Sequence, residues 1–73
     1  MHIAAHWKIY NRTGEEIDFV EKQLHEITKA SVVRAETFHG KNYDALYVIR
    51  GDIDAQNLAD ACCFMDDAGA FPV

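Results

Sequence analysis

The chain begins with a stretch in which apolar and polar residues alternate. From Ile3 to Tyr10, in the sequence IAAHWKIY, every second residue is apolar, and His6 and Lys8 occupy two of the intervening positions. This two-residue period is typical of a β-strand that buries one face. The sequence therefore predicts a strand over residues 3–10, with Tyr10 on the same open face as the two basic side chains.

A helix is predicted to follow this strand. Thr13 and Glu16 have the spacing of a capping box, so we expect the helix to begin near Gly14 and to end near Lys29. Its apolar stripe is expected to consist of Ile17, Val20, Leu24 and Ile27. Phe19 lies roughly 110° away from this stripe. It is therefore either an aromatic that packs at the side of the helix, under a loop, or an exposed residue that contacts a partner.

Two further segments rich in β-forming residues, 31–38 and 43–50, are joined by HGKN, which suits a hairpin turn. After the hairpin, Asp52 or Asp54 can cap a second helix. The apolar stripe of this helix is expected to consist of Leu58, Ala61, Cys62 and Met65. Gly69 is expected to end the helix, and the last four residues then pack in an extended conformation or fray.

The order of these elements, β-α-β-β-α, predicts an α+β fold. The helical crossover makes the first two strands parallel, and the hairpin makes the third strand antiparallel to the second. The simplest result is a three-stranded, mostly antiparallel sheet of the split β-α-β type, with the third strand in the middle. We expect one domain over residues 1–73, with the long first helix on one face of the sheet and the C-terminal helix on the same face or at an edge.

Composition and charge narrow the range of functions. A chain of 73 residues, 49% hydrophobic and 26% charged, builds one small core, which favours a binding surface over a closed catalytic pocket. The net charge of −5 comes entirely from residues 51–73, which hold five aspartates and no basic side chain. This imbalance disfavours direct binding to nucleic acid and favours a protein partner with a basic surface.

The sequence also indicates a location and excludes several chemistries. It has no apolar run long enough for a membrane span and no signal-peptide pattern, so we expect a cytoplasmic protein without membrane contact. We also expect a monomer rather than an oligomer. Cys62 and Cys63 are adjacent, so on a helix they point about 100° apart, and we expect them to pack in the core. No glycine-rich phosphate loop or metal-ligand spacing is present. We expect no enzyme activity, no cofactor and no metal.

Two aspartates near the end of the second predicted helix have two interpretations, of which one is a surface that binds a partner. Asp66 and Asp67 fall in its last turn, where the helix dipole disfavours negative charge by a few tenths to about 1 kcal/mol. The alternative is a solvated acidic face without a function. Aromatic residues near the acids suit a protein interface with apolar anchors and a charged rim. The candidate partner-binding residues are Asp60, Phe64, Asp66, Asp67, Phe71 and Phe19, with Tyr43 and Tyr47 added if their sheet face is open rather than part of the core.

The chain resembles the small transcription regulators that lytic bacteriophages encode against the RNA polymerase of their host. The resemblance rests on the length of the whole chain, on its compact, cofactor-free composition and on the acidic segment GDIDAQNLADACCFMDD. It implies a protein of the host bacterial cytoplasm that binds the large polymerase subunits, blocks promoter recognition by displacing the sigma factor, and also acts in antitermination. No family motif is present, so it assigns no individual residues.

Our leading hypothesis is therefore a non-enzymatic, phage-encoded regulator that binds RNA polymerase and inhibits the initiation of transcription. Three alternatives remain open. One is an acidic inhibitor of a nucleic-acid-binding defence complex, such as a CRISPR or restriction system, in which the aspartates imitate phosphates. Another is a small ligand-binding or enzymatic domain that uses Cys63 and a sheet face. The last is a structural subunit that forms a homo-oligomer by strand pairing.

Overall fold

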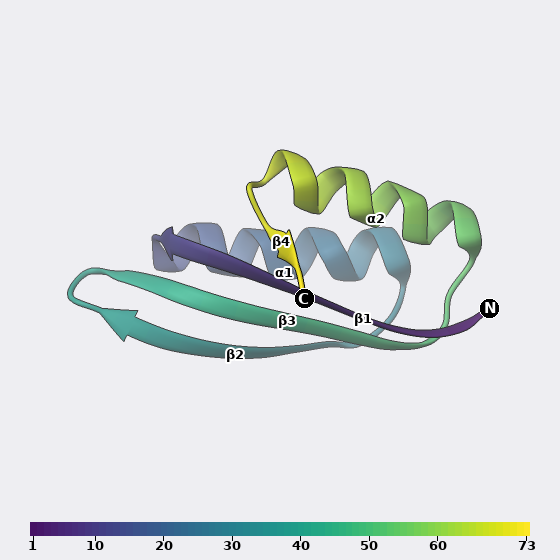
Figure 1. Cartoon of the computed structure of the whole chain (residues 1–73), viewed down its shortest axis with the longest axis horizontal. Helices are drawn as coiled ribbons and strands as arrows, with labels where there is room; N and C mark the ends of the chain where they lie inside the picture. Colours follow the sequence, from purple (N-terminus) through teal and green to yellow (C-terminus); the bar gives the residue numbers. More distant parts are fainter.

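The chain forms two helices and four strands in a computed structural model that describes residues 1–73 (Figure 1). In chain order the elements are β1 (His2–Arg12), α1 (Gly14–Thr28), β2 (Val32–His39), β3 (Asn42–Asp52), α2 (Ala55–Asp67) and β4 (Phe71–Pro72). The predicted α+β class is confirmed. The sheet, however, contains one strand more than the three that the sequence predicts. No helix has the length and apolar character that crossing a bilayer requires.

The sheet is antiparallel between all neighbouring strands, in the order β2-β3-β1-β4. The hairpin strand β3 lies between β1 and β2, as the sequence predicts. Tyr47 occupies the middle of this arrangement, since it pairs with Trp7 on one side and with Arg34 on the other. Because both neighbours are antiparallel to β3, β1 and β2 run in the same direction.

The fourth strand corrects the predicted three-stranded topology. β4 pairs with Trp7 and Lys8 on the outer edge of β1, and the amide of Val73 donates a hydrogen bond to a β1 carbonyl at 3.1 Å. Gly69, with a φ of +80°, lies where the chain turns back from α2 toward this edge. A strand of two residues has no alternating pattern, which is why the sequence indicated only an extended or frayed end.

Helix α1 forms as its sequence predicts. Thr13 and Glu16 make both bonds of the capping box, since each accepts a hydrogen bond from the backbone N–H of the other at 3.2 and 3.0 Å. The helix ends at Thr28, and Lys29 caps it in the left-handed conformation with a φ of +60°. Its apolar stripe faces the sheet, with Ile17, Val20 and Leu24 buried and Ile27 half-buried.

Helix α2 corrects the predicted position of the cysteines. Asp54 caps the helix, and its buried stripe consists of Ala61 and Met65, flanked by half-buried residues. Cys62 and Cys63 are both exposed, free thiols. They follow Ala61 directly, and each residue of a helix is rotated by about 100° from the one before. The prediction that the two cysteines pack in the core is therefore wrong.

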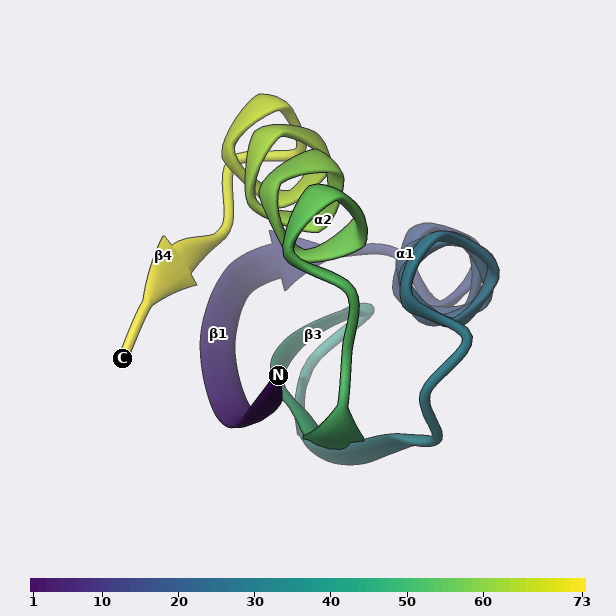
Figure 2. The ribbon, with the colours of Figure 1, turned by 90° about the vertical axis from the view of Figure 1, so that its right-hand side faces the viewer.

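Both helices cover the same face of the sheet, and the opposite face is open (Figure 2). The strands place large side chains under the helices, among them Trp7, Ile9, Tyr47 and Ile49, which are each at most 4% exposed. These residues and the helix stripes form one core. The fold is therefore a two-layer structure, with the helices on one side and a solvated sheet face on the other.

The tyrosines of β3 belong to the core side of this structure. Tyr47 is fully buried and donates a hydrogen bond from its hydroxyl to the carbonyl of Ile17 at 2.8 Å, and Tyr43 is half-buried. The register pairs Tyr47 with Trp7, which faces the helices, whereas Tyr10 is exposed on the opposite face. Tyr43 and Tyr47 therefore do not form an open patch with Tyr10, and the proposed partner-binding role of Tyr47 is wrong because its side chain is inaccessible.

Candidate protein-binding groove

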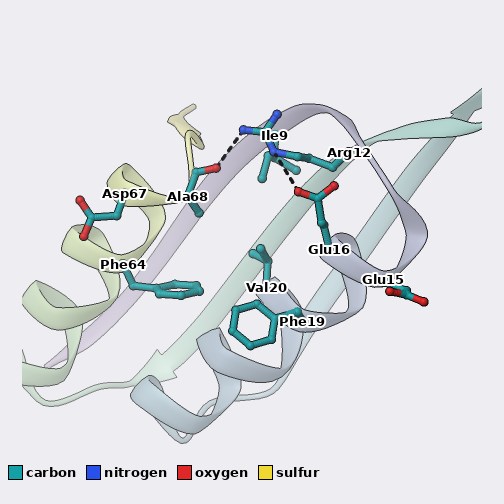
Figure 3. Close-up of a pocket in the computed structure, with 9 residues that line it drawn as sticks. All are labelled: Ile9, Arg12, Glu15, Glu16, Phe19, Val20, Phe64, Asp67 and Ala68. Carbon is teal, nitrogen blue, oxygen red and sulfur yellow. Dashed lines mark hydrogen bonds and ion pairs between the residues drawn. The ribbon is translucent and has the colours of Figure 1, made fainter.

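A groove of about 570 Å³ lies between α1 and α2 (Figure 3). Ile9 of β1 and Val20 of α1, both buried core residues, line its base. The rings of Phe19 and Phe64 reach toward each other from the two helices. The groove is therefore apolar at its base and between its walls, and it is open to solvent.

The two aromatic rings form a pair across the groove. Their centroids are 6.4 Å apart and their planes are inclined by 55°, which is a favourable arrangement for aromatic side chains. Phe19 is nevertheless 57% exposed, while Phe64 is half-buried. The off-stripe position of Phe19 directs it toward α2 instead of the sheet. Phe19 thus packs against α2 rather than under a loop, and it also presents a large exposed apolar surface.

Acidic side chains surround the apolar part of the groove. Glu15 and Glu16 come from the first turn of α1, and Asp67 comes from the last turn of α2. The side chains of Glu15 and Asp67 have no salt bridge within the chain and project outward in Figure 3. Two unpaired carboxylates near an exposed aromatic pair favour a ligand that is both apolar and positively charged.

Arg12 is the one basic residue of the groove, and its guanidinium is already engaged. It donates hydrogen bonds to the carbonyls of Ala68 and Tyr10, both at 3.0 Å, and lies 3.9 Å from the carboxylate of Glu16. The space around it is tight, because a Cβ atom on Gly69 would lie 2.6 Å from its Nη2. Arg12 therefore ties the end of β1 to the end of α2 and does not neutralise the free acids.

This contact changes the interpretation of the aspartates at the end of α2. Asp66 and Asp67 do lie in the last turn, and that turn contains no basic side chain. The positive charge comes instead from Arg12 of β1, which binds the Ala68 carbonyl at the end of the helix. Sequence reasoning missed this residue because more than fifty positions separate the two partners, and no local pattern joins them.

The capping box keeps the carboxylate of Glu16 ionised. The backbone N–H of Thr13 donates to it, the Thr13 side chain adds a second favourable hydrogen-bond contribution, and the charge of Arg12 acts in the same direction. Together these interactions hold the pKa of Glu16 below its ordinary value. The carboxylate is thus charged and occupied, which leaves Glu15 and Asp67 as the acids available to a partner.

The other predicted acids lie outside the groove. Asp60 accepts a hydrogen bond from the side-chain amide of Gln56 at 3.0 Å on the exposed part of α2. Asp66 lines a separate hollow of about 360 Å³ together with Trp7 and the two cysteines. Of the three aspartates predicted to act together, only Asp67 belongs to the groove.

Phe71 is also separate from the groove. It is 60% exposed, and its ring lies 6.1 Å from that of Tyr10. Because Phe71 pairs with Lys8 in the register of β4 and β1, both side chains lie on the open face of the sheet. The expectation that Phe64 and Phe71 anchor one common surface is therefore wrong, since the two lie on opposite sides of the sheet.

The groove has the chemistry of a binding site. Nowhere in the chain do three or more His, Cys, Asp or Glu side chains come close enough together to hold a metal ion. The groove itself offers two aromatic rings, an apolar base and two free carboxylates. Apolar and aromatic side chains with charged groups around them have the composition that is typical of protein interfaces.

Comparisons with protein-family models, with curated proteins and with solved structures find no match to this chain. The residues of the groove are therefore the basis on which a function is assigned.

Proposed function

We propose that this chain is a non-enzymatic regulator that binds a basic surface of another protein through the groove between α1 and α2. The observation that carries the proposal is the exposed Phe19, which faces Phe64 across a groove with acids at its edge. Large aromatic residues at a partly dry centre, with charges around them, are the usual anchors of protein interfaces.

The groove defines the kind of segment that it binds. An apolar side chain of the partner packs on the exposed surface of the Phe19–Phe64 pair, and lysine or arginine residues beside it face Glu15 and Asp67. The volume of about 570 Å³ suits a few side chains of a peptide segment or a surface loop. The acids raise the rate of encounter with a basic surface, while the aromatic contact slows dissociation.

We favour bacterial RNA polymerase as the partner, because of the resemblance to phage-encoded regulators in length and in the acidic C-terminal segment. In this proposal the protein occupies a basic surface of the large polymerase subunits, hinders promoter recognition by displacing the sigma factor, and also acts in antitermination. The host bacterial cytoplasm is then its site of action. A complex that binds DNA in host defence is the second candidate target, because acids near a groove also imitate phosphates.

The experiment measures binding of the chain to purified bacterial RNA polymerase by biolayer interferometry. Phe19→Ala is expected to weaken binding roughly 30-fold, which corresponds to about 2 kcal/mol for an interface anchor. Phe71→Ala is the matched control, since Phe71 is 60% exposed but lies on the other face of the sheet. Equal effects of the two substitutions would refute the groove as the binding site.

The charge component is tested separately with Glu15→Gln combined with Asp67→Asn. This variant is expected to associate more slowly and to show a weaker dependence of the association rate on salt. Asp60→Asn removes one charge from α2 outside the groove and provides the control. No binding of the unaltered chain to polymerase would refute the proposed target, and competition with DNA for a defence nuclease would then support the second candidate.

A further inference from the structure

The two edges of the sheet differ in how they are protected. At one edge, β4 covers part of β1 and contributes Pro72, and β1 itself is irregular where Asn11 has a φ of +57°. At the other edge, β2 pairs with β3 over eight consecutive residues without a shift in register. Bulges, prolines, short strands and charged side chains are features by which proteins prevent strand pairing at an edge. β2 is eight residues long without a bulge or a proline, and its charged residues, Arg34 and Glu36, form an ion pair with each other.

The outer side of β2 is uncovered. Six of its eight residues are exposed, including Val33 at 64% and Phe38 at 58%. All backbone hydrogen bonds of β2 are made with β3, and no loop or side chain bonds to its backbone from the other side. Half of the backbone N–H and C=O groups of this strand are thus available to another strand.

We propose that β2 pairs antiparallel with β2 of a second copy of this chain, with the twofold axis at Ala35. In this register Arg34 lies opposite Glu36 of the second copy, and Glu36 lies opposite Arg34 of the second copy. Val32 likewise faces Phe38 of the second copy, and the reverse pair repeats the contact. Opposite charges and apolar pairs directly across two strands are the contacts that stabilise antiparallel pairing.

Neighbouring registers that keep the helices on one face are unfavourable. A twofold axis at Arg34 would place the two Arg34 side chains opposite each other, and an axis at Glu36 would do the same with the two Glu36 side chains. Like charges directly opposite each other destabilise a strand pair. The sequence of β2 therefore selects the register centred on Ala35.

The charged residues of β2 are already held in place for this pairing. Nη1 of Arg34 lies 2.7 Å from Asp18 and 2.9 Å from Glu21, both on α1. Nη2 lies 3.5 Å from Glu36 of the same strand, whose carboxylate remains partly exposed. In the dimer each Glu36 carboxylate then lies between two guanidinium groups, one from each copy.

The dimer contains one continuous sheet of eight strands, with all helices on one face and both grooves present. The contact between two eight-residue strands is small, so dimerisation is expected in the micromolar to millimolar range. The proposal replaces the monomer expected from the sequence. It does not depend on the function proposed for the groove.

Sedimentation equilibrium of Ala35→Lys and Ala35→Glu tests both the dimer and its register. Ala35 is exposed, so the fold should tolerate either residue, and circular dichroism of each variant verifies this. Each variant alone places like charges opposite each other at the twofold axis and should dimerise roughly fivefold or more weakly than the unaltered chain. An equimolar mixture places lysine opposite glutamate and should recover the dimer.

Ala4→Lys and Ala4→Glu are the matched controls, because Ala4 is an exposed alanine on the same face of the sheet, but on β1. Neither control should change the dimerisation constant. A chain that stays monomeric at millimolar concentration would overturn the proposal. A dimer that the Ala35 variants do not weaken, or that their mixture does not recover, would overturn the register.

Discussion

The bond between Arg12 and the end of α2 leads to a prediction about two residues that are far apart in the sequence. Gly69 has a φ of +80°, and a Cβ atom at this position would lie 2.6 Å from Nη2 of Arg12. The substitution Gly69→Ala therefore has two effects. It forces a residue with a side chain into the left-handed region, and it displaces the guanidinium from the carbonyl of Ala68.

The two effects, on the backbone conformation at position 69 and on the hydrogen bond from Arg12 to Ala68, each have an expected cost in the free energy of unfolding. The left-handed conformation costs about 1 kcal/mol for alanine. Loss of the partly buried, charge-assisted hydrogen bond adds about 1.5 kcal/mol. Gly69→Ala should thus lower the free energy of unfolding by about 2.5 kcal/mol, or Tm by about 15 °C for a domain of this size. Arg12→Ala alone should lower it by about 1.5 kcal/mol, because the partly buried hydrogen bond to Ala68 is lost and the more exposed contacts with Tyr10 and Glu16 contribute little.

The double variant separates the two effects. With Arg12 already removed, Gly69→Ala disturbs only the backbone, so both changes together should cost about 2.5 kcal/mol instead of the sum of about 4 kcal/mol. Urea unfolding followed by fluorescence of Trp7, the only tryptophan and 4% exposed, measures all four proteins. Arg50→Ala is the control, because Arg50 is exposed and forms no salt bridge. Additive effects in the double variant would refute the contact.

Two other contacts give predictions of the same kind. Tyr47→Phe should lower the free energy of unfolding by about 1 kcal/mol, since it removes the buried hydrogen bond to Ile17. Because burial raises the pKa of Tyr47 in the folded state, the unaltered chain should lose stability as pH rises above about 10, and urea unfolding at several pH values should show a smaller loss for Tyr47→Phe. Thr13→Ala should lower stability by about 1 kcal/mol through loss of the helix cap. It should also raise the pKa of Glu16 part of the way toward its ordinary value in an NMR titration, because the backbone N–H at position 13 remains and only the side-chain contribution is lost. An unchanged pKa would contradict the contribution assigned to the Thr13 side chain.

Much of the fold is encoded in local patterns of the sequence. The alternation around Trp7, the capping box at Thr13 and the stripe of α1 each concern residues within a few positions of one another, so the sequence alone predicts them. The sheet order followed from the crossover and the hairpin, which restrict the possible topologies. β4 was not predicted because two residues are too few for a periodic pattern.

The candidate site was only partly predictable. Phe19, Phe64 and Asp67 were identified from their positions on the helices, and the structure brings all three to one groove. Their grouping with Asp66 and Phe71 was wrong, because the rotation of α2 and the direction of the chain after Gly69 depend on tertiary packing. The role of Arg12 depends on a contact between the first strand and the last helix, which no local pattern encodes.

The position of β1 in the sheet has a consequence for the order in which the chain folds. β1 is made first, but both of its neighbours, β3 and β4, come from later parts of the chain, so Trp7 has no strand partner until Tyr47 has been synthesised. The β2–β3 hairpin and the two helices rest on local contacts and form sooner. The closure entropy of a long loop must then be overcome before the centre of the sheet forms. Folding is therefore expected to be limited by the docking of β1 and slower than in a helical protein of this length.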